Sequence, residues 1–278
     1  MNLKPKVIGG AVLLTAIPVL LTSLAVLTVA TSESEVALET EAKNRLIAIR
    51  DVSRARISDY LETIRKQILT YSEDRMVVEA MKAFRSDFRI YRDQVPEDTA
   101  KLKADLATYY NREFSEEYAK RNPGEESPAS QWLSRLDDES IALQYRYIKA
   151  NSHPLGPKDK LDDPGDDSEY ARHHRLYHPV VRSFLEKFGF YDIFLVDPET
   201  GDIVYSVFKE LDFTTSLKNG SFASSGIGEV FNRANQATSA DYVAVSDFAS
   251  YGPSYQDPAS FIASPVFDGS EKIGVLIF

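Results

Sequence analysis

A long uncharged stretch at residues 7–30 is the feature that most constrains how this chain can fold. It contains apolar residues, a few Thr, Ser and Gly, and one Pro. Its roughly 24 residues, at about 1.5 Å per residue, are enough to cross the hydrocarbon core of a bilayer. Lys4 and Lys6 precede it and glutamates follow it, which predicts that the bulk of the chain lies outside the cytoplasm. A cleaved signal peptide is the alternative, but its apolar region would be shorter, about 7–15 residues.

The anchor, the net charge and the absence of cysteine limit where the chain lies and what it can bind. Residues 1–31 are expected to form a cytoplasmic tip and a transmembrane signal anchor, which leaves residues 32–278 extracytoplasmic. The net charge of −10, without a basic stripe, argues against nucleic acid as a partner. The chain has no cysteine, so it can form neither disulfides nor thiolate metal sites, and it is compatible with an oxidising compartment.

A helical pattern without Gly or Pro follows the anchor and extends to about residue 92. Apolar and small residues recur along it at helical spacing: Leu46, Ile49, Ser53, Ile57, Tyr60, Leu61, Ile64, Ile68 and Tyr71. A helix of this length has to bury its apolar stripe against something. We expect a long stalk helix that forms a parallel homodimer, and an intramolecular bundle without a dimer is the alternative.

Two further helices are expected at residues 97–121 and 128–149, so that residues 32–150 form the stalk helix and a helical subdomain. Residues 151–179, rich in Pro, Gly and Asp, predict a loop-rich linker. Four acids in it (Asp162, Asp163, Asp166 and Asp167) lack the ligand spacing of an EF-hand. His174 and His178 lack a metalloprotease motif, so no metal site is expected.

The C-terminal part has the pattern of an antiparallel sheet. A hairpin is expected at residues 191–208, with its turn at Pro198-Glu199-Thr200-Gly201, after a short helix at 180–188. A helix at 226–237 and a strand at 242–246 follow, and a second hairpin joins 261–267 to 273–278. The chain is therefore expected to be α+β, with an antiparallel five-stranded sheet domain at residues 180–278.

Three segments and this order of elements resemble a known family. YIKANSHPLGPKDKLD, RLYHPVVRSFLEKFGFYDIFLVDPETGDIVYSVFKELDFTTSL and SGIGEVFNRA resemble the periplasmic region of one group of methyl-accepting chemotaxis receptors. The order of elements is similar to that of the extracytoplasmic Cache (PAS-like) sensor domain, and the resemblance covers about residues 144–278. It implies ligand sensing and transmembrane signalling at the bacterial inner membrane. Related input regions precede membrane nucleotide cyclases, histidine kinases and phosphatases.

Receptors of this kind carry a second membrane helix and a cytoplasmic signalling domain, and neither is present in these 278 residues. The sequence also ends inside an apolar strand. We therefore expect the chain to be the N-terminal portion of a longer receptor, with its last strand cut.

No catalytic motif is present, so neither an enzyme nor a cofactor is expected. The resemblance implies a small-molecule pocket against the sheet, where aromatics enclose the ligand and an acid binds an amine. The candidate ligand-binding residues are Tyr205, Asp212, Tyr242, Asp247, Tyr251 and Tyr255. Asp247 would be the polar anchor. The alternatives are core packing for the tyrosines, turn capping for the two acids, and a membrane-anchored scaffold without sensing for the whole chain.

Overall fold

The computed structural model describes residues 3–278 and divides the chain into two compact units, Met1–Glu62 and Thr63–Phe278. Helix α1 (Leu3–Ser72) is continuous across the boundary between the units. Residues 1–2, part of the expected cytoplasmic tip, lie outside the described residues.

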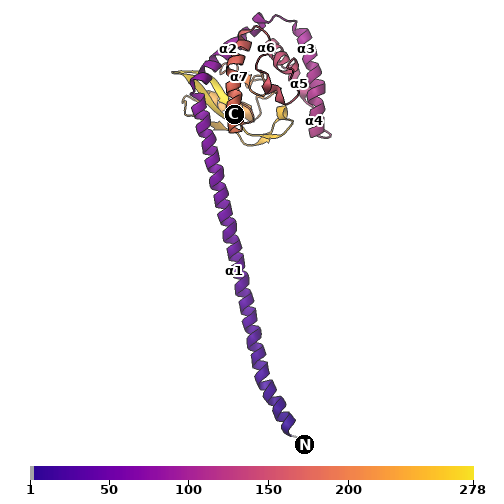
Figure 1. The fold of residues 1–278 in the computed structure, drawn as a ribbon, viewed down its shortest axis with the longest axis vertical. Coiled ribbons are helices and arrows are strands. Elements are labelled where there is room, and N and C mark those ends of the chain that lie inside the picture. The colour runs from indigo at the N-terminus through magenta and orange to yellow at the C-terminus, as the bar shows by residue number, and fades with distance from the viewer. Residues whose placement is uncertain (1–2) are drawn as a thin grey trace. The chain divides into compact units, whose positions relative to one another are not determined.

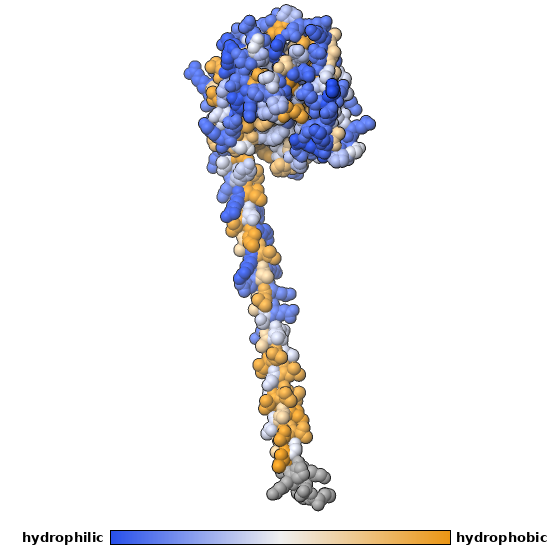
Figure 2. All heavy atoms as spheres, turned by 45° about the vertical axis from the view of Figure 1, so that its right-hand side comes forward, coloured by the Kyte–Doolittle hydropathy of each residue, from blue (hydrophilic) through white to orange (hydrophobic). Residues whose placement is uncertain are grey.

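The described residues of the first unit all belong to helix α1. By length and composition, α1 is long and apolar enough to cross a membrane near the N-terminus. Pro18 lies inside the helix without ending it. Figure 2 shows apolar residues gathered along the part of α1 nearest the N-terminus, and a mixture of apolar and hydrophilic residues farther along. The expected apolar N-terminal helix is therefore confirmed.

The expectation of one uninterrupted helix to residue 92 is wrong. Helix α1 ends at Ser72, and α2 (Arg75–Gln94) begins after a break at residues 73–74. Asp74 is the cause, because its side chain accepts a hydrogen bond from the backbone N–H of Met76 at 2.8 Å. An N-cap of this kind starts a new helix and lets the chain change direction.

The next helical stretch is confirmed at residues 99–121. It consists of α3 (Thr99–Thr108), a π-helical segment (Tyr109–Phe114) and α4 (Ser115–Arg121). The expected helix at 128–149 is instead two short helices, α5 (Ala129–Ser134) and α6 (Asp138–Gln144), followed by a π-helical segment (Tyr145–Lys149). Asp137 separates them because its side chain caps α6 at the N–H of Ser140.

The linker is shorter than expected. Its loop, which includes a 3-10 turn (Pro157–Lys160), gives way to α7 (Glu169–Phe188) rather than continuing to residue 179. Ser168 caps α7 by accepting from the N–H of Ala171, and Pro179 is accommodated inside the helix. Gly189, at φ 75°, ends the helix, because glycine adopts this left-handed conformation without steric penalty.

The five-stranded antiparallel sheet is confirmed, in the order β2-β1-β7-β6-β3. Its strands are β1 (Phe194–Val196), β2 (Ile203–Ser206), β3 (Ala244–Val245), β6 (Ile262–Asp268) and β7 (Glu271–Ile277). Both expected hairpins form, and β1 pairs with β7 at the centre of the sheet. Helix α8 (Gly226–Gln236) packs along β3, β6 and β7. The region expected as a loop after residue 246 contains a small separate hairpin, β4 (Ala249–Ser250) with β5 (Pro258–Ala259), and a 3-10 turn (Gly252–Ser254).

One face of the sheet packs against helices. The strand register puts Leu195, Tyr205, Ser264 and Leu276 on this face. Phe84 of α2 stacks on Tyr205 with ring centroids 4.7 Å apart, and α7 lies beside α2 (Figure 1). The opposite face, which includes Phe194, carries a cavity described below.

The last turn of α1 belongs to this core. The ring of Tyr71 stacks on Phe184 of α7 at 3.9 Å and lies 6.0 Å from the ring of Phe278. Ile68 and Ser72 are also buried, and the hydroxyl of Ser72 contacts that of Ser264 in β6. The last turn of α1, which lies in the second unit, thus packs against α7 and the sheet.

Candidate functional site

A cavity of about 330 Å³ lies between the sheet and the small hairpin β4–β5. We call it the hairpin cavity. Its walls are mostly aromatic and apolar, and they include Tyr191, Asp192, Phe194, Phe248, Tyr251, Ser254, Asp257, Pro258, Ala259, Ser260, Phe261 and Phe278. A cavity of this volume is large enough for a small metabolite, and a few polar groups among aromatic walls are typical of ligand sites.

Asp192 is the buried acid of the hairpin cavity, with only 2% of its surface exposed. Its Oδ1 accepts backbone N–H groups of Ile193, Val207 and Phe208 at 2.6, 2.8 and 3.2 Å. These bonds close the open end of the β1–β2 hairpin, since Asp192 precedes β1 and residues 207–208 follow β2. Its Oδ2 has no hydrogen-bond partner among the described residues. A buried carboxylate oxygen without a donor is costly, which favours a partner from outside the chain.

Two more carboxyl groups complete an acidic cluster of Asp192, Glu210 and Asp212. Asp212 is fully buried and accepts the hydroxyl of Tyr251 at 2.5 Å. Glu210 is half-buried and accepts the hydroxyls of Tyr191 at 2.6 Å and Ser254 at 3.1 Å. Burial raises the pKa of all three carboxyls, and the charge of Asp212 raises the pKa of Asp192 and Glu210 further. The cluster therefore favours protons, and the buried ammonium of Lys209, whose charge lowers the pKa of Asp192, is a cation that the chain itself places near it.

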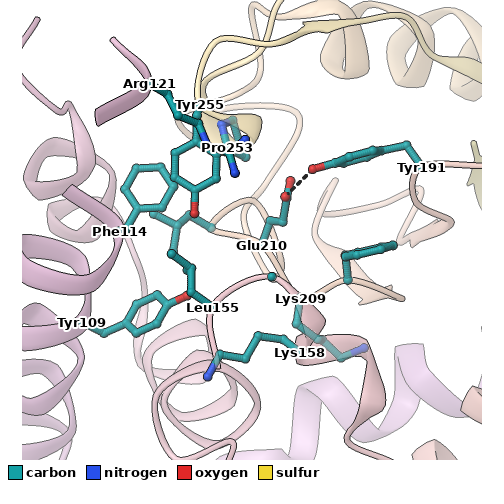
Figure 3. A pocket seen from close by; sticks show the side chains of 13 residues that line it. Tyr109, Phe114, Arg121, Leu155, Lys158, Tyr191, Lys209, Glu210, Pro253 and Tyr255 are labelled. Carbon is teal, nitrogen blue, oxygen red and sulfur yellow. Dashed lines mark hydrogen bonds between the residues drawn. The ribbon is translucent and has the colours of Figure 1, made fainter. Parts of the chain in front are cut away.

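A second cavity, of about 110 Å³, is lined by Glu210 and is shown in Figure 3. We call it the tyrosine cavity. Tyr109 and Tyr255 line one side of it, and Glu210 and Tyr191 line the other. Tyr255 stacks on Phe114 with centroids 4.9 Å apart, and the guanidinium of Arg121 lies 4.4 Å from its ring centroid. Tyr191 lines both cavities, so its hydrogen bond to Glu210 is part of the partition between them.

A different polar network lies on the helix-covered face of the sheet. His174 and His178 of α7 are fully buried, with ring centroids 4.2 Å apart. Nε2 of His178 contacts the carbonyl of Asp159 at 2.5 Å, so it must carry the proton, and Nδ1 then accepts the hydroxyl of Tyr205 at 2.7 Å. Burial lowers the pKa of both histidines, and the nearby charge of Lys209 lowers it further.

Lowering the pH should lower the free energy of unfolding, because His174 and His178 are held neutral in the folded protein. The folded-state pKa values lie below the unfolded value, so stability is lost as pH falls below about 6.5, where the unfolded chain binds more protons. His174→Phe should therefore be less stable than the wild type near pH 8, because it loses the bond from Nδ1 to the carbonyl of Asp162, and this deficit should shrink towards about pH 5.5. Urea unfolding at both pH values measures the deficit. A constant deficit would contradict the assignment.

The six residues suggested by the sequence lie in several places. Tyr251 lines the hairpin cavity and is bonded to Asp212, which is buried and lines neither cavity, and Tyr255 lines the tyrosine cavity. Tyr205 is buried on the opposite face of the sheet, against Phe84 and His178. Tyr242 is partly buried against the core and lines neither cavity. Asp247 is exposed, accepts the N–H of Phe248 and lines neither cavity. A role in ligand binding stays a prediction for these residues.

Sequence reasoning missed Asp192, Tyr191 and Glu210. A signal existed at Asp192, because a single acid directly before an apolar strand has to be either exposed or specifically bonded. Nothing in the local sequence shows that the N–H groups of residues 207–208 return to this acid. That contact depends on the pairing of β1 with β2.

Among residues 3–278 no group of three or more His, Asp or Glu side chains is arranged to hold a metal ion. No protein-family model, curated protein or solved structure shows significant similarity to the chain.

Proposed function

We propose that this chain is the extracytoplasmic ligand-binding portion of a transmembrane signal transducer of the chemotaxis-receptor type. In this proposal residues 7–30 anchor it in the bacterial inner membrane and residues 32–278 are periplasmic. The ligand is a small organic cation that binds in the hairpin cavity, with its ammonium group at Asp192.

The observation that carries the proposal is the position of Phe278. Its ring lines the hairpin cavity and also lies 6.0 Å from the ring of Tyr71 in α1. A ligand that changes the position of Phe278 can therefore act directly on the helix that leads to the anchor. Such a ligand shifts the state of α1 only if it binds two arrangements of this contact unequally.

The chemistry of the cavity favours an amine. An ammonium group that reaches the buried Oδ2 of Asp192 would supply the charge-assisted hydrogen bond that this oxygen lacks, and the aromatic lining, which includes Tyr191, Tyr251 and Phe261, suits a cation. An anion would meet the acidic cluster and be repelled. A metal ion would require several oxygen ligands, whereas the cavity offers one unpartnered buried carboxylate oxygen and apolar walls.

Calorimetry of the full chain in detergent tests the proposal. Amines would be paired with uncharged hydroxyl analogues, such as putrescine with butanediol and ethanolamine with ethylene glycol. We expect an amine to bind and to raise the unfolding temperature, and its analogue to do neither. Affinity should increase as the pH rises from about 5.5 to about 8, because the raised pKa values keep the carboxyls protonated at the lower pH and binding must displace a proton.

Two results would contradict parts of this proposal. If alcohols bind as tightly as amines, the role of Asp192 is wrong. If no compound of a broad metabolite panel binds a folded chain, the membrane-anchored scaffold becomes the better interpretation. The input region of a cyclase, kinase or phosphatase would bind ligand in the same way. Attaching residues 1–278 to different signalling domains therefore tests which type of output domain the chain controls.

A further inference from the structure

Residues 251–257, which join β4 to β5, belong both to the hairpin cavity and to the contact between the sheet region and the helices. We call this segment the hairpin tip. Tyr251, Ser254 and Asp257 of the tip line the hairpin cavity. Other residues of the tip contact the region of α3, α4 and α5 (residues 99–134), which we call the α3–α5 region. The tip is therefore a part of the cavity wall on which these helices can act.

Two adjacent residues of the hairpin tip have a left-handed backbone although neither is glycine. Tyr255 has φ 57° and Gln256 has φ 67°. This conformation is sterically costly for a residue with a Cβ atom, and it persists only where the surrounding structure holds it. Hydrogen bonds within the tip hold it in part, since the N–H of Gln256 donates to the carbonyl of Tyr251 at 2.9 Å. The strain indicates that contacts from outside the tip contribute as well.

Helix α4 supplies such contacts to both strained residues. The side-chain amide of Asn122 donates to the carbonyl of Tyr255 at 3.0 Å, and that of Gln256 donates to the hydroxyl of Tyr118 at 3.0 Å. Asn122 is itself held at the C-terminal end of α4, because its amide also donates to the carbonyl of Tyr118 at 3.1 Å. With the stacking of Tyr255 on Phe114, these bonds fix the strained pair to the α3–α5 region.

The single tryptophan of the chain contacts the same tip from α5. A Cβ atom at Gly252 would lie 2.7 Å from two ring atoms of Trp132, so only glycine fits this close approach. The ring centroid of Trp132 also lies 5.8 Å from that of Phe114. The fluorescence of Trp132 therefore reports on the contact between the α3–α5 region and the hairpin tip.

We propose that the α3–α5 region positions one wall of the hairpin cavity, with Asn122 and Tyr118 as the positioning residues. They hold the strained pair, and with it the cavity-lining residues of the tip, in the arrangement that a ligand meets. A wall already in this arrangement binds ligand without first being ordered, which raises affinity. The inference rests on the proposed ligand site. Asn122, Tyr118 and Gln256 line neither cavity, so their effect on binding has to come through the tip.

Asn122→Ala tests the proposal, with Asn111→Ala as the matched control. Asn111 lies in the same region, but its side chain accepts the hydroxyl of Ser130 at 2.8 Å rather than bonding to the tip. In calorimetry of the full chain with the tightest amine of the panel, we expect Asn122→Ala to bind about tenfold more weakly, as if the competent arrangement fell to about a tenth of the population. Asn111→Ala should bind as the wild type does. The amine should change the fluorescence of Trp132 in the wild type, and less so in Asn122→Ala.

Two substitutions at Gln256 separate positioning from a general loss of stability. Gln256→Gly adopts the left-handed conformation without strain, whereas the branched Cβ of Gln256→Val opposes it. The glycine variant should bind the amine within about threefold of the wild type, also in a Tyr118→Phe background, because its conformation needs less support. The valine variant should bind at least about tenfold more weakly than the glycine variant. Urea unfolding identifies the conditions under which every variant is folded.

Wild-type affinity in both Asn122→Ala and Gln256→Val would overturn the proposal. If the wild type binds no amine, the proposed function fails, and positioning is decided without ligand. The backbone amides of residues 255–257, which are bonded within the tip, should then exchange hydrogen faster in Asn122→Ala than in Asn111→Ala. Equal exchange in the two variants would show that Asn122 does not hold the tip.

Discussion

Replacing Asp192 with asparagine is expected to weaken binding of a cationic amine by about 100-fold, since loss of one partner in a buried charge pair removes roughly 2–5 kcal/mol. Asparagine keeps the shape of the side chain and a carbonyl oxygen for the N–H groups of Ile193, Val207 and Phe208. The substitution therefore removes the charge and leaves the end of the β1–β2 hairpin closed. Calorimetry with the tightest amine of the panel measures the loss.

The same substitution should stabilise the ligand-free protein at high pH. Burial raises the folded-state pKa of Asp192 above its unfolded value, so the wild type loses stability as pH rises from about 4 through that raised pKa. Asp192→Asn has no such loss. The unfolding free energy of Asp192→Asn, measured in urea, should therefore exceed that of the wild type by an amount that increases between about pH 5.5 and about pH 8.

Asp247→Asn is the matched control, because Asp247 is exposed, lines neither cavity and accepts the N–H of Phe248 beside it. We expect neither affinity nor stability to change in this variant. If Asp247→Asn loses amine affinity and Asp192→Asn keeps it, Asp247 is the anchor after all, and the hairpin cavity is not the binding site.

The contrast between these two acids shows how far the sequence could identify the site. Both acids lie beside apolar segments, and each forms a short-range bond to a following N–H. They differ in burial, which is a consequence of sheet pairing and cannot be recognised from neighbouring residues. The tyrosines present the same difficulty, since Tyr205 and Tyr251 lie on opposite sides of the sheet although both are fully or almost fully buried.

The fold was more predictable than the site because its signals are local. The Pro198–Gly201 and Asp268-Gly269 turns specify hairpins, and the apolar spacing of residues 226–236 specifies α8. The errors lie where one polar side chain has two possible roles. Asp74 and Asp137 lie inside the expected helices but act as N-caps, and the Asp-rich loop conceals that α7 begins at Glu169, with Ser168 as its cap.

Tyr71→Ala is the second substitution with a large expected effect. Tyr71 is buried, stacks on Phe184 at 3.9 Å and contacts Phe278, so truncation should remove about 3–5 kcal/mol of unfolding free energy. Tyr71→Phe is the control, because the hydroxyl of Tyr71 is buried and has no hydrogen-bond partner among the described residues. Its loss should leave stability unchanged or slightly higher. Urea unfolding of both variants measures these changes.

The pair of variants also tests whether Tyr71 couples the hairpin cavity to α1. In the Tyr71→Phe background an amine should still change the hydrogen exchange of backbone amides in the last turns of α1, because the ring that contacts Phe278 is kept. In the Tyr71→Ala background, at a temperature where the protein stays folded, the amine should bind but leave that exchange unchanged. A ligand-dependent exchange that survives Tyr71→Ala would show that α1 responds through another contact, such as that between Ser72 and Ser264. We expect coupling through this single ring, since Phe278 lines the cavity and its ring lies 6.0 Å from that of Tyr71.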